Sequence, residues 1–303
     1  MTSADALRRR AAAELTAAGV ESASHDAAEL LAHVLAVEPG RLLLIDDVDI
    51  EQEEHFAELV RRRARREPLQ HITGTAHFAG IELAVGPGVF VPRPETELIV
   101  EWATRVVAGR TAVVADLCSG SGALALGIAA HSPNTQVVAV ERSSDALDYL
   151  RRNISVASLE TRVTALHGDV TDAAAMHKAL GACDVIVSNP PYVPSESPVS
   201  PEVAHDPYDA VFSGTTGMDV ISAMIPIVAD ALVGGGAFAV EHDDETADAV
   251  VAALRADGRF SSIEAHADLA GRPRFVTATR ISSHTSFGRG EPDPAADRAR
   301  MEQ

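Results

Sequence analysis

The residues that most clearly could carry out a reaction are Asn189, Pro190, Pro191 and Tyr192. They directly follow an apolar segment that predicts a strand. An amide or aromatic amine nitrogen is a poor nucleophile because its lone pair is delocalised. The Asn189 side-chain carbonyl and the Pro190 backbone carbonyl can each accept one N–H of such a group and turn its lone pair toward an electrophilic methyl group. The prolines stiffen the loop, and Tyr192 offers a flat wall. The alternative is a purely structural role, as a proline-rich turn around a buried tyrosine.

A second motif, Asp116-Leu117-Cys118-Ser119-Gly120-Ser121-Gly122-Ala123, follows another predicted strand and opens a helix. Gly120 and Gly122 allow a tight turn and the close approach of a ligand. Glu141 ends the next strand, where a carboxylate can accept the hydroxyls of a ribose. The spacing also fits a nicotinamide dinucleotide, so it does not settle the ligand. Asp169 follows the third strand, from which a loop can reach an adenine edge.

The elements that must position these motifs alternate along residues 95–280. The patterns predict strands at 112–117, 136–140, 163–166, 184–188, 237–241, near 263 and at 275–280, with helices at 95–108, 123–130, 144–157, after 217 and at 245–257. Strands separated by helices predict an α/β fold with a parallel, doubly wound sheet. Ligands of such sheets bind beyond the carboxyl ends of the strands, so both motifs should open into one cleft.

The sequence before residue 93 is organised differently. Three helices are predicted within the first 66 residues, and alternating residues around Gly80 predict a hairpin. The predicted division is a helical domain at 1–74, a β-hairpin linker at 75–92, the α/β domain at 93–281 and a mobile tail at 282–303. The third helix ends in a run of arginines at 61–66. Because like-charge runs usually lie on solvated faces, a solvated helix end is favoured over docking of an acidic partner.

Composition narrows the function further. The 303 residues carry 25 Lys and Arg against 44 Asp and Glu, a formal net charge of −19. Such a surface repels phosphate backbones, which argues against nucleic acid as the main partner. The two cysteines, Cys118 and Cys183, are too few for a disulfide framework and should be small buried residues. Because the sequence has no membrane-spanning run, secretory leader or metal-ligand spacing, we expect a cytoplasmic protein without a metal.

Taken together, these motifs resemble the protein-(glutamine-N5) methyltransferases that modify peptide chain release factors. The resemblance runs from about residue 27 to residue 280. Its most specific stretch is Gly88-Val89-Phe90-Val91-Pro92-Arg93-Pro94-Glu95-Thr96-Glu97, and Gln70–Gly74, Glu202, Gly214, Gly217, Glu241 and Asp268–Arg274 also match. It implies a Rossmann-like S-adenosylmethionine-dependent methyltransferase domain with a small N-terminal helical domain that recognises the substrate.

The resemblance also implies roles for individual residues. S-adenosylmethionine, which leaves as S-adenosylhomocysteine, would contact Asp116, Cys118, Ser119, Gly120, Ser121, Gly122, Glu141, Asp169, Val170 and Asn189. The substrate would be the glutamine of the Gly-Gly-Gln motif of class I release factors. Its side chain would lie against Phe90, Asn189, Pro190, Pro191 and Tyr192, with the tetrapeptide as the catalytic group. A monomer is expected.

Some positions depart from the family pattern. Val170 stands where some relatives carry an aromatic residue, so stacking on adenine would be weaker there. Asp206 replaces a common Glu, and the Gly that often follows Glu241 is absent. These departures bear on cofactor affinity more than on the type of reaction.

Two other functions remain open from the sequence alone. An adenine-N6 methyltransferase uses the same tetrapeptide on a flipped base, although the negative charge and the helical N-terminal domain oppose it. A protein that binds NAD through the glycine loop alone is the other alternative.

Overall fold

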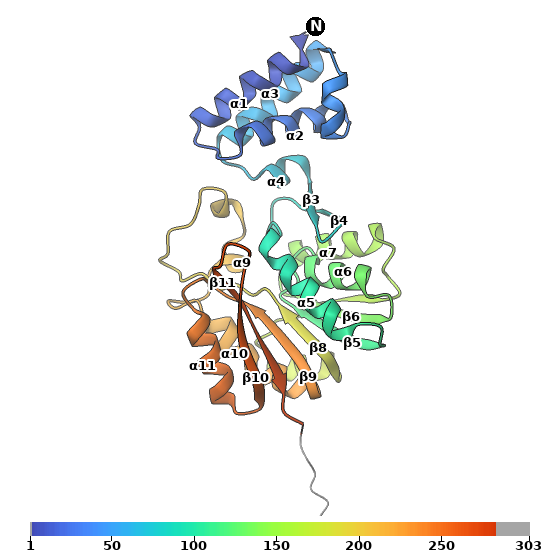
Figure 1. The fold of residues 1–303 in the computed structure, drawn as a ribbon, viewed down its shortest axis with the longest axis vertical. Helices are drawn as coiled ribbons and strands as arrows, with labels where there is room; N and C mark the ends of the chain where they lie inside the picture. The colour runs from blue at the N-terminus through green and yellow to red at the C-terminus, as the bar shows by residue number, and fades with distance from the viewer. Residues whose placement is uncertain (1, 283–303) are drawn as a thin grey trace, which may run out of the picture.

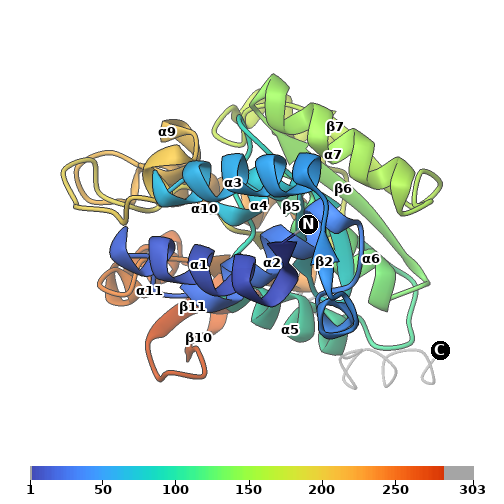
Figure 2. The same cartoon turned by 90° about the horizontal axis from the view of Figure 1, so that it is seen from above.

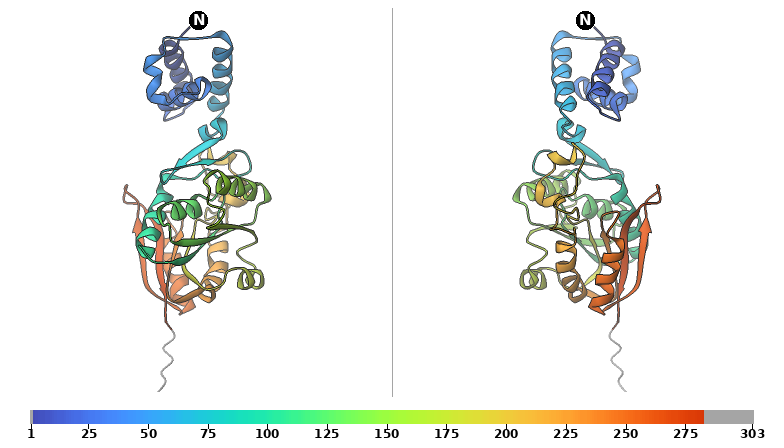
Figure 3. Two further views of the ribbon diagram at one scale, coloured as in Figure 1. Left: turned by 90° about the vertical axis from the view of Figure 1, so that its right-hand side faces the viewer. Right: turned by 90° about the vertical axis from the view of Figure 1, so that its left-hand side faces the viewer.

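The computed structural model describes residues 2–282, so the tail predicted at 282–303 lies, apart from Ser282, outside the described part of the chain. Figure 1 shows a group of helices at the N-terminal end and a larger part built on a twisted sheet. Seen from above in Figure 2, these helices lie over one end of the sheet. Figure 3 shows that α4 (Leu69–Thr73) and a hairpin join the two parts.

The three helices predicted for the N-terminal part are present, and each buries an apolar stripe at helical spacing. They are α1 (Ala4–Ala17), α2 (Ala23–Leu35) and α3 (Ile50–Ala64). A reciprocal cap starts α3: the Asp49 side chain accepts from the Gln52 N–H at 2.8 Å, and the Gln52 side chain accepts from the Asp49 N–H at 3.3 Å. Short elements that the sequence did not predict complete this part: β1 (Thr2–Ser3), η1 (Pro39–Leu44), β2 (Asp47–Val48) and α4.

The arginines at the end of α3 are not all solvated, and the prediction was wrong for Arg63 and Arg66. The Arg63 side chain is 7% exposed, and it donates to Asp26 at 2.6 Å and to Glu202 at 3.0 Å. Arg66 donates two hydrogen bonds to the same Glu202 carboxylate, at 2.6 and 2.7 Å. Local sequence could not show these contacts, because Glu202 is far along the chain and meets the arginines only in the folded protein. It lies beside η3 (Val203–His205) in the sheet domain.

This contact gives a pH-dependent prediction. Burial disfavours ionised Glu202, but the hydrogen bonds from Arg66 and Arg63 outweigh it and lower the pKa of Glu202 from 4.5 to about 2. A lowered carboxyl pKa stabilises the fold above pH 4.5, and this contribution is lost as the pH falls toward 2. Glu202→Gln should therefore lower the free energy of unfolding by about 1–3 kcal/mol at pH 7, and by much less at pH 3.

Denaturant titrations at the two pH values measure this difference. The exposed Glu160 provides the matched control, since Glu160→Gln removes the same charge without touching α3. An equal loss of stability at pH 7 and pH 3 in Glu202→Gln would contradict the assignment.

The predicted hairpin is present and is anchored to the sheet domain. Its strands are β3 (Thr75–Phe78) and β4 (Ile81–Ala84). Phe78 is 1% exposed in the same core as the central strands. The Asn153 side chain in α7 (Ser144–Val156) accepts from the Ala84 N–H at 2.7 Å and donates to the Ala84 carbonyl at 3.0 Å. The hairpin is therefore a fixed part of the sheet domain.

Within residues 2–282 a seven-stranded sheet has the order β10-β11-β9-β8-β5-β6-β7. The strands are β5 (Ala112–Leu117), β6 (Thr135–Glu141), β7 (Val163–His167), β8 (Cys183–Ser188), β9 (Leu232–Glu241), β10 (Phe260–Ala267) and β11 (Pro273–Arg280). The strands from β9 to β7 run parallel, as predicted. This sheet confirms the α/β fold class.

The prediction of an all-parallel sheet was wrong at one edge, where β11 lies antiparallel to both β9 and β10. The reason is the short turn that follows β10. The Asp268 N–H donates to the Arg272 carbonyl at 2.8 Å, and the Arg272 N–H donates to the Asp268 side chain at 3.0 Å. So short a connection forces the next strand to return in the opposite direction.

Helices cover both faces of the sheet. One face carries α5 (Glu97–Val107), α6 (Ala123–His131) and α7 together with the hairpin, and the other carries α8 (Ala173–Ala179), α10 (Asp219–Ala231) and α11 (Ala247–Asp257). The sequence did not predict α8 or the short η2 (Pro94–Thr96) and α9 (Tyr208–Val211). Among residues 2–282 no helix is both long and apolar enough to cross a membrane, and no three His, Cys, Asp or Glu side chains gather as metal ligands would.

Candidate active site

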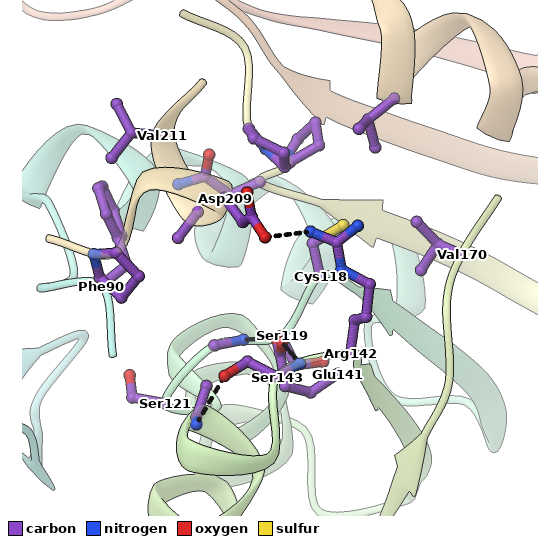
Figure 4. Close-up of a pocket in the computed structure, with 18 of the residues that line it drawn as sticks. Phe90, Cys118, Ser119, Ser121, Glu141, Arg142, Ser143, Val170, Asp209 and Val211 are labelled. Carbon is purple, nitrogen blue, oxygen red and sulfur yellow. Dashed lines mark hydrogen bonds and ion pairs between the residues drawn. The ribbon is translucent and has the colours of Figure 1, made fainter. Parts of the chain in front are cut away.

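The loops after β5, β6 and β8 open into one cavity of about 720 Å³ at the carboxyl ends of these strands. This volume is in the usual range for a small-molecule site. Figure 4 shows part of its wall. The cavity is lined by nearly all of the residues selected from the sequence: Phe90, Asp116, Cys118, Ser119, Gly120, Ser121, Glu141, Asp169, Val170, Asn189, Pro190, Pro191 and Tyr192.

Gly122 is the exception, because it does not line the cavity. It has φ +91° at the start of α6, and its N–H donates to the Ser119 carbonyl at 2.8 Å. An added Cβ would lie 2.6 Å from the Leu150 side chain. A glycine is therefore needed at position 122 for the tight turn and for the close packing of this turn against α7, not for contact with a ligand.

Glu141 ties the glycine loop to the end of β6. Its carboxylate accepts from the Gly120 N–H at 2.8 Å and from the Ser143 N–H at 2.7 Å. Each carboxylate oxygen keeps a lone pair for a further donor. A Cβ added at Gly120 would meet no atom within 4 Å, so the loop backbone faces open space. Figure 4 shows Glu141 and Ser143 on the same side of the cavity as Ser119 and Ser121.

Two buried polar atoms of the loop lack a partner within the described chain. One Asp116 carboxylate oxygen accepts from the Ala125 N–H at 3.0 Å, but the other, Oδ1, has no hydrogen bond, and neither does the Ser121 hydroxyl. Burial raises the pKa of Asp116 to about 7. A buried carboxylate with a free oxygen fits a cationic ligand group such as an ammonium.

Cys118 differs from the expectation for a buried core cysteine. It is half-buried on the cavity wall and adopts a left-handed φ of +63°, whereas Cys183 is 1% exposed. Burial raises the pKa of the Cys118 thiol, so it remains protonated at neutral pH. A positive φ is costly for a residue other than glycine, so the surrounding fold must hold Cys118 in this conformation.

The tetrapeptide of residues 189–192 is held by contacts at both ends. The Asn189 amide donates to the Thr96 hydroxyl at 3.2 Å, and the Tyr192 hydroxyl donates to the Glu241 carboxylate at 2.9 Å. The Tyr192 carbonyl lies so close to Gly217, which has φ +76°, that any Cβ there would collide with it. The loop therefore has little freedom to move.

Phe90 lies on the cavity wall. The Arg93 guanidinium carbon lies 4.7 Å from the centre of its ring, and Arg93 is also paired with the buried Asp206 carboxylate. The Asp206 side chain in turn accepts from the Val91 N–H at 3.2 Å. These contacts fix the segment that carries the aromatic ring.

Sequence reasoning missed several residues of this cavity. Arg142, next to Glu141, lies 3.5 Å from the Asp209 carboxylate and 3.7 Å from that of Asp169, and Figure 4 shows the contact with Asp209. Its place directly after a strand could have drawn attention to it. Asp209 gave no comparable signal. Thr96 belongs to the family-like stretch at 88–97, but nothing there indicates its role, because it reaches the cavity only through tertiary folding.

A doubly wound sheet whose glycine loop, strand-end carboxylate and Asn-Pro-Pro-Tyr loop share one cavity defines a Rossmann-like methyltransferase that uses S-adenosylmethionine. The free Asp116 oxygen fits the ammonium group of that molecule, and Glu141 fits its ribose. The comparisons agree, since residues 87–206 match the family described as methyltransferase small domain and residues 6–74 match the PrmC N-terminal domain.

Curated relatives specify the family. A release factor glutamine methyltransferase from Mycolicibacterium smegmatis is 50% identical over 90% of this chain and 96% of its own length. Proteins of the same name from Corynebacterium glutamicum and Mycobacterium tuberculosis are 46% and 44% identical, over 93% and 97% of this chain and 100% and 97% of their own lengths. The chain belongs to the release factor glutamine methyltransferase family. The comparisons give no support to the nucleic-acid alternative.

Proposed function

We propose that the protein transfers the methyl group of S-adenosylmethionine to the side-chain amide nitrogen of the glutamine in the Gly-Gly-Gln motif of class I release factors. The observation that carries this proposal is the direction of the Asn189 amide. Its NH2 group is bound to Thr96, which leaves its carbonyl oxygen available to a substrate in the cavity that also contains the glycine loop.

The glycine-loop half of the cavity would bind the cofactor, which supplies an electrophilic methyl group when bound. Glu141 would accept from the ribose hydroxyls and Asp116 from the ammonium group. Asp169 and Val170 would lie against the adenine, and the remaining contacts would come from Cys118, Ser119, Gly120, Ser121 and Asn189. Val170 is 5% exposed and offers an apolar contact.

The tetrapeptide would orient the substrate amide. The Asn189 Oδ1 and the Pro190 carbonyl would each accept one N–H of the glutamine, which pins the nitrogen and turns its lone pair toward the methyl group. Tyr192, Pro191 and Phe90 would enclose the flat carboxamide. As the N–C bond formed, the methyl–sulfur bond would break and S-adenosylhomocysteine would leave, while the nitrogen gained positive charge beside two acceptor oxygens. It then releases one proton to solvent, so no strong general base is required.

The rest of the release factor would be recognised outside the cavity. We propose that residues 1–74 form the substrate-recognition domain, with the linker at 75–92 and the methyltransferase domain at 93–281. The protein would act as a monomer in the cytoplasm. Its negative charge is consistent with a protein substrate rather than a nucleic acid.

Mass spectrometry of a purified class I release factor tests this function. Incubation with the protein and S-adenosylmethionine should add one methyl group to the Gly-Gly-Gln peptide. A release factor with that glutamine replaced by glutamate is the control, since it keeps the shape but lacks the NH2 group, and it should remain unmodified. Methylation of the control peptide, or of adenine in added DNA or RNA instead of the release factor, would refute the proposal.

A further inference from the structure

The carboxylate of Glu241 lies behind the tetrapeptide and has no place in the function proposed above. Glu241 ends β9, and the parallel pairing of Ser188 with Val240 brings the end of β9 next to Asn189. The Glu241 residue is 1% exposed, and Thr96 is 2% exposed. A carboxylate so deeply buried is costly unless its oxygens are satisfied.

Both oxygens of this carboxylate are bound by residues that reach the active site. Glu241 Oε2 accepts from the Thr96 hydroxyl at 2.6 Å, and Oε1 accepts from the Tyr192 hydroxyl at 2.9 Å. Thr96 in turn contacts Asn189 Nδ2 at 3.2 Å. One buried group therefore connects to the first and the last residue of the tetrapeptide.

The number of protons in this chain of hydrogen bonds determines the direction of the Asn189 amide. An ionised carboxylate can only accept, so the single proton of the Thr96 hydroxyl must point to Glu241. Thr96 can then only accept from its other neighbour. Asn189 must present its NH2 group to Thr96, and its carbonyl oxygen must face away from it.

We propose that Glu241, acting through Thr96 and Tyr192, is a positioning residue that fixes the acceptor side of Asn189 toward the substrate. This deepens the proposed function and rests on it. The consequence is selectivity for a substrate that brings N–H donors, such as a primary carboxamide, over an acceptor such as a carboxylate. If Asn189 turned over, its NH2 group would face the substrate nitrogen and repel its N–H groups.

The role requires an ionised Glu241, and the donors around it favour that form. Burial is the largest influence and raises the pKa of Glu241 above its ordinary value, while the hydrogen bonds from Thr96 and Tyr192 and the nearby Arg274 guanidinium act in the opposite direction. Arg274 is itself held by Asp268 at 3.2 Å and Asp244 at 3.0 Å. Hydrogen bonds to a charged group are stronger than neutral ones, so the hydrogen bonds that link Glu241 to Thr96 and Tyr192 should be well ordered.

Thr96→Val is the sharpest test, because it keeps the shape of the side chain and removes only the hydroxyl. We expect kcat for methylation of the release factor to fall about 10–100-fold. The KM for the release factor and the dissociation constant of S-adenosylhomocysteine, measured by calorimetry, should change less than about threefold, since most of the release factor would bind outside the cavity and the glycine loop is untouched. Thr96→Ser is the matched variant: it restores the hydroxyl and should recover most of the lost turnover.

A double-mutant cycle separates positioning from general support of the fold. In an Asn189→Ala background the orientation of the amide no longer matters, so Thr96→Val should lower kcat little further. An unchanged kcat in Thr96→Val, a full additional loss in the Asn189→Ala background, or a parallel loss of S-adenosylhomocysteine binding would overturn the proposal.

A second variant covers the case in which Thr96→Val does not fold. Glu241→Met keeps the length of the side chain but removes both acceptor oxygens, so the Thr96 hydroxyl is free to donate to Asn189 and the amide can turn over. It should show the same fall in kcat with unchanged cofactor binding, and unchanged turnover in Glu241→Met would also overturn the proposal. Failure of the proposed function can be told apart from failure of the positioning role. In the first case the wild-type enzyme itself would not methylate the release factor.

Discussion

Replacing Asn189 with alanine is expected to lower kcat for glutamine methylation by roughly 10²–10³-fold, the usual effect of removing one preorganised polar group at a reacting centre. The variant loses the acceptor that holds one N–H of the substrate amide. The contacts that order the cofactor loop, such as Glu141 with Gly120, lie on other elements and remain. Asn189 is also proposed to contact the cofactor, but as one contact among many, so the affinity for S-adenosylhomocysteine should fall less than about tenfold.

Single-turnover kinetics on a release factor and calorimetry with S-adenosylhomocysteine measure the two quantities separately. The Gly-Gly-Gln peptide is followed by mass spectrometry so that the site of modification is known. If the variant turns over as fast as the wild-type enzyme, Asn189 has no role in the reaction. A loss of product binding as large as the loss of turnover would show that Asn189 acts mainly through the cofactor.

Asp116→Asn is expected to change stability and ligand affinity in opposite directions. Burial raises the pKa of Asp116 from 3.8 to about 7. A raised carboxyl pKa means that stability is greatest below pH 3.8, falls as the pH rises toward 7 and is constant above it. The neutral amide avoids this loss, so the variant should be more stable than the unmodified protein by about 2–4 kcal/mol at pH 8 and by less at pH 5.

The same substitution should weaken S-adenosylhomocysteine binding roughly 10–100-fold, since a charged partner for the ligand ammonium is lost. In the unmodified protein the affinity should rise between pH 6 and pH 8 as Asp116 ionises, and this rise should disappear in the variant. Denaturant titrations and calorimetry at several pH values provide both measurements.

Asp148→Asn is the matched control, because Asp148 is exposed on α7 and outside the cavity. It removes the same charge and should leave both the pH dependence of stability and the ligand affinity unchanged. A stability gain in Asp116→Asn that is the same at pH 5 and pH 8 would contradict the ionisation argument.

The parts of this protein that were predictable from sequence are those encoded by local patterns. The alternation of strands and helices predicted the parallel part of the sheet. The position of Asp116 at the end of one strand and of Asn189 directly after another placed both beside the same cleft. These predictions succeed because the carboxyl ends of adjacent parallel strands meet at one edge whatever the details of packing.

The predictions that failed depend on contacts between distant segments. The antiparallel direction of β11 follows from the short turn after β10, which the alternation of strands and helices alone does not indicate. The ion pairs of Arg63 and Arg66 depend on Glu202, which lies more than 130 residues away along the chain. No local pattern identifies Thr96 as the link between Asn189 and Glu241, because that chain of hydrogen bonds exists only in the folded domain.

The ion pairs between α3 and Glu202 also limit how the protein could be recombined with its relatives. A helical domain transplanted from another family member would bring its own residues to the positions of Arg63 and Arg66, while Glu202 would stay behind with the recipient. Unless the donor also carries cations at these two positions, the half-buried Glu202 carboxylate would lose its partners. It would then lie unpaired close to the segment that leads to Asp206. The boundary for such a chimaera should therefore be chosen by these paired charges rather than by the hairpin.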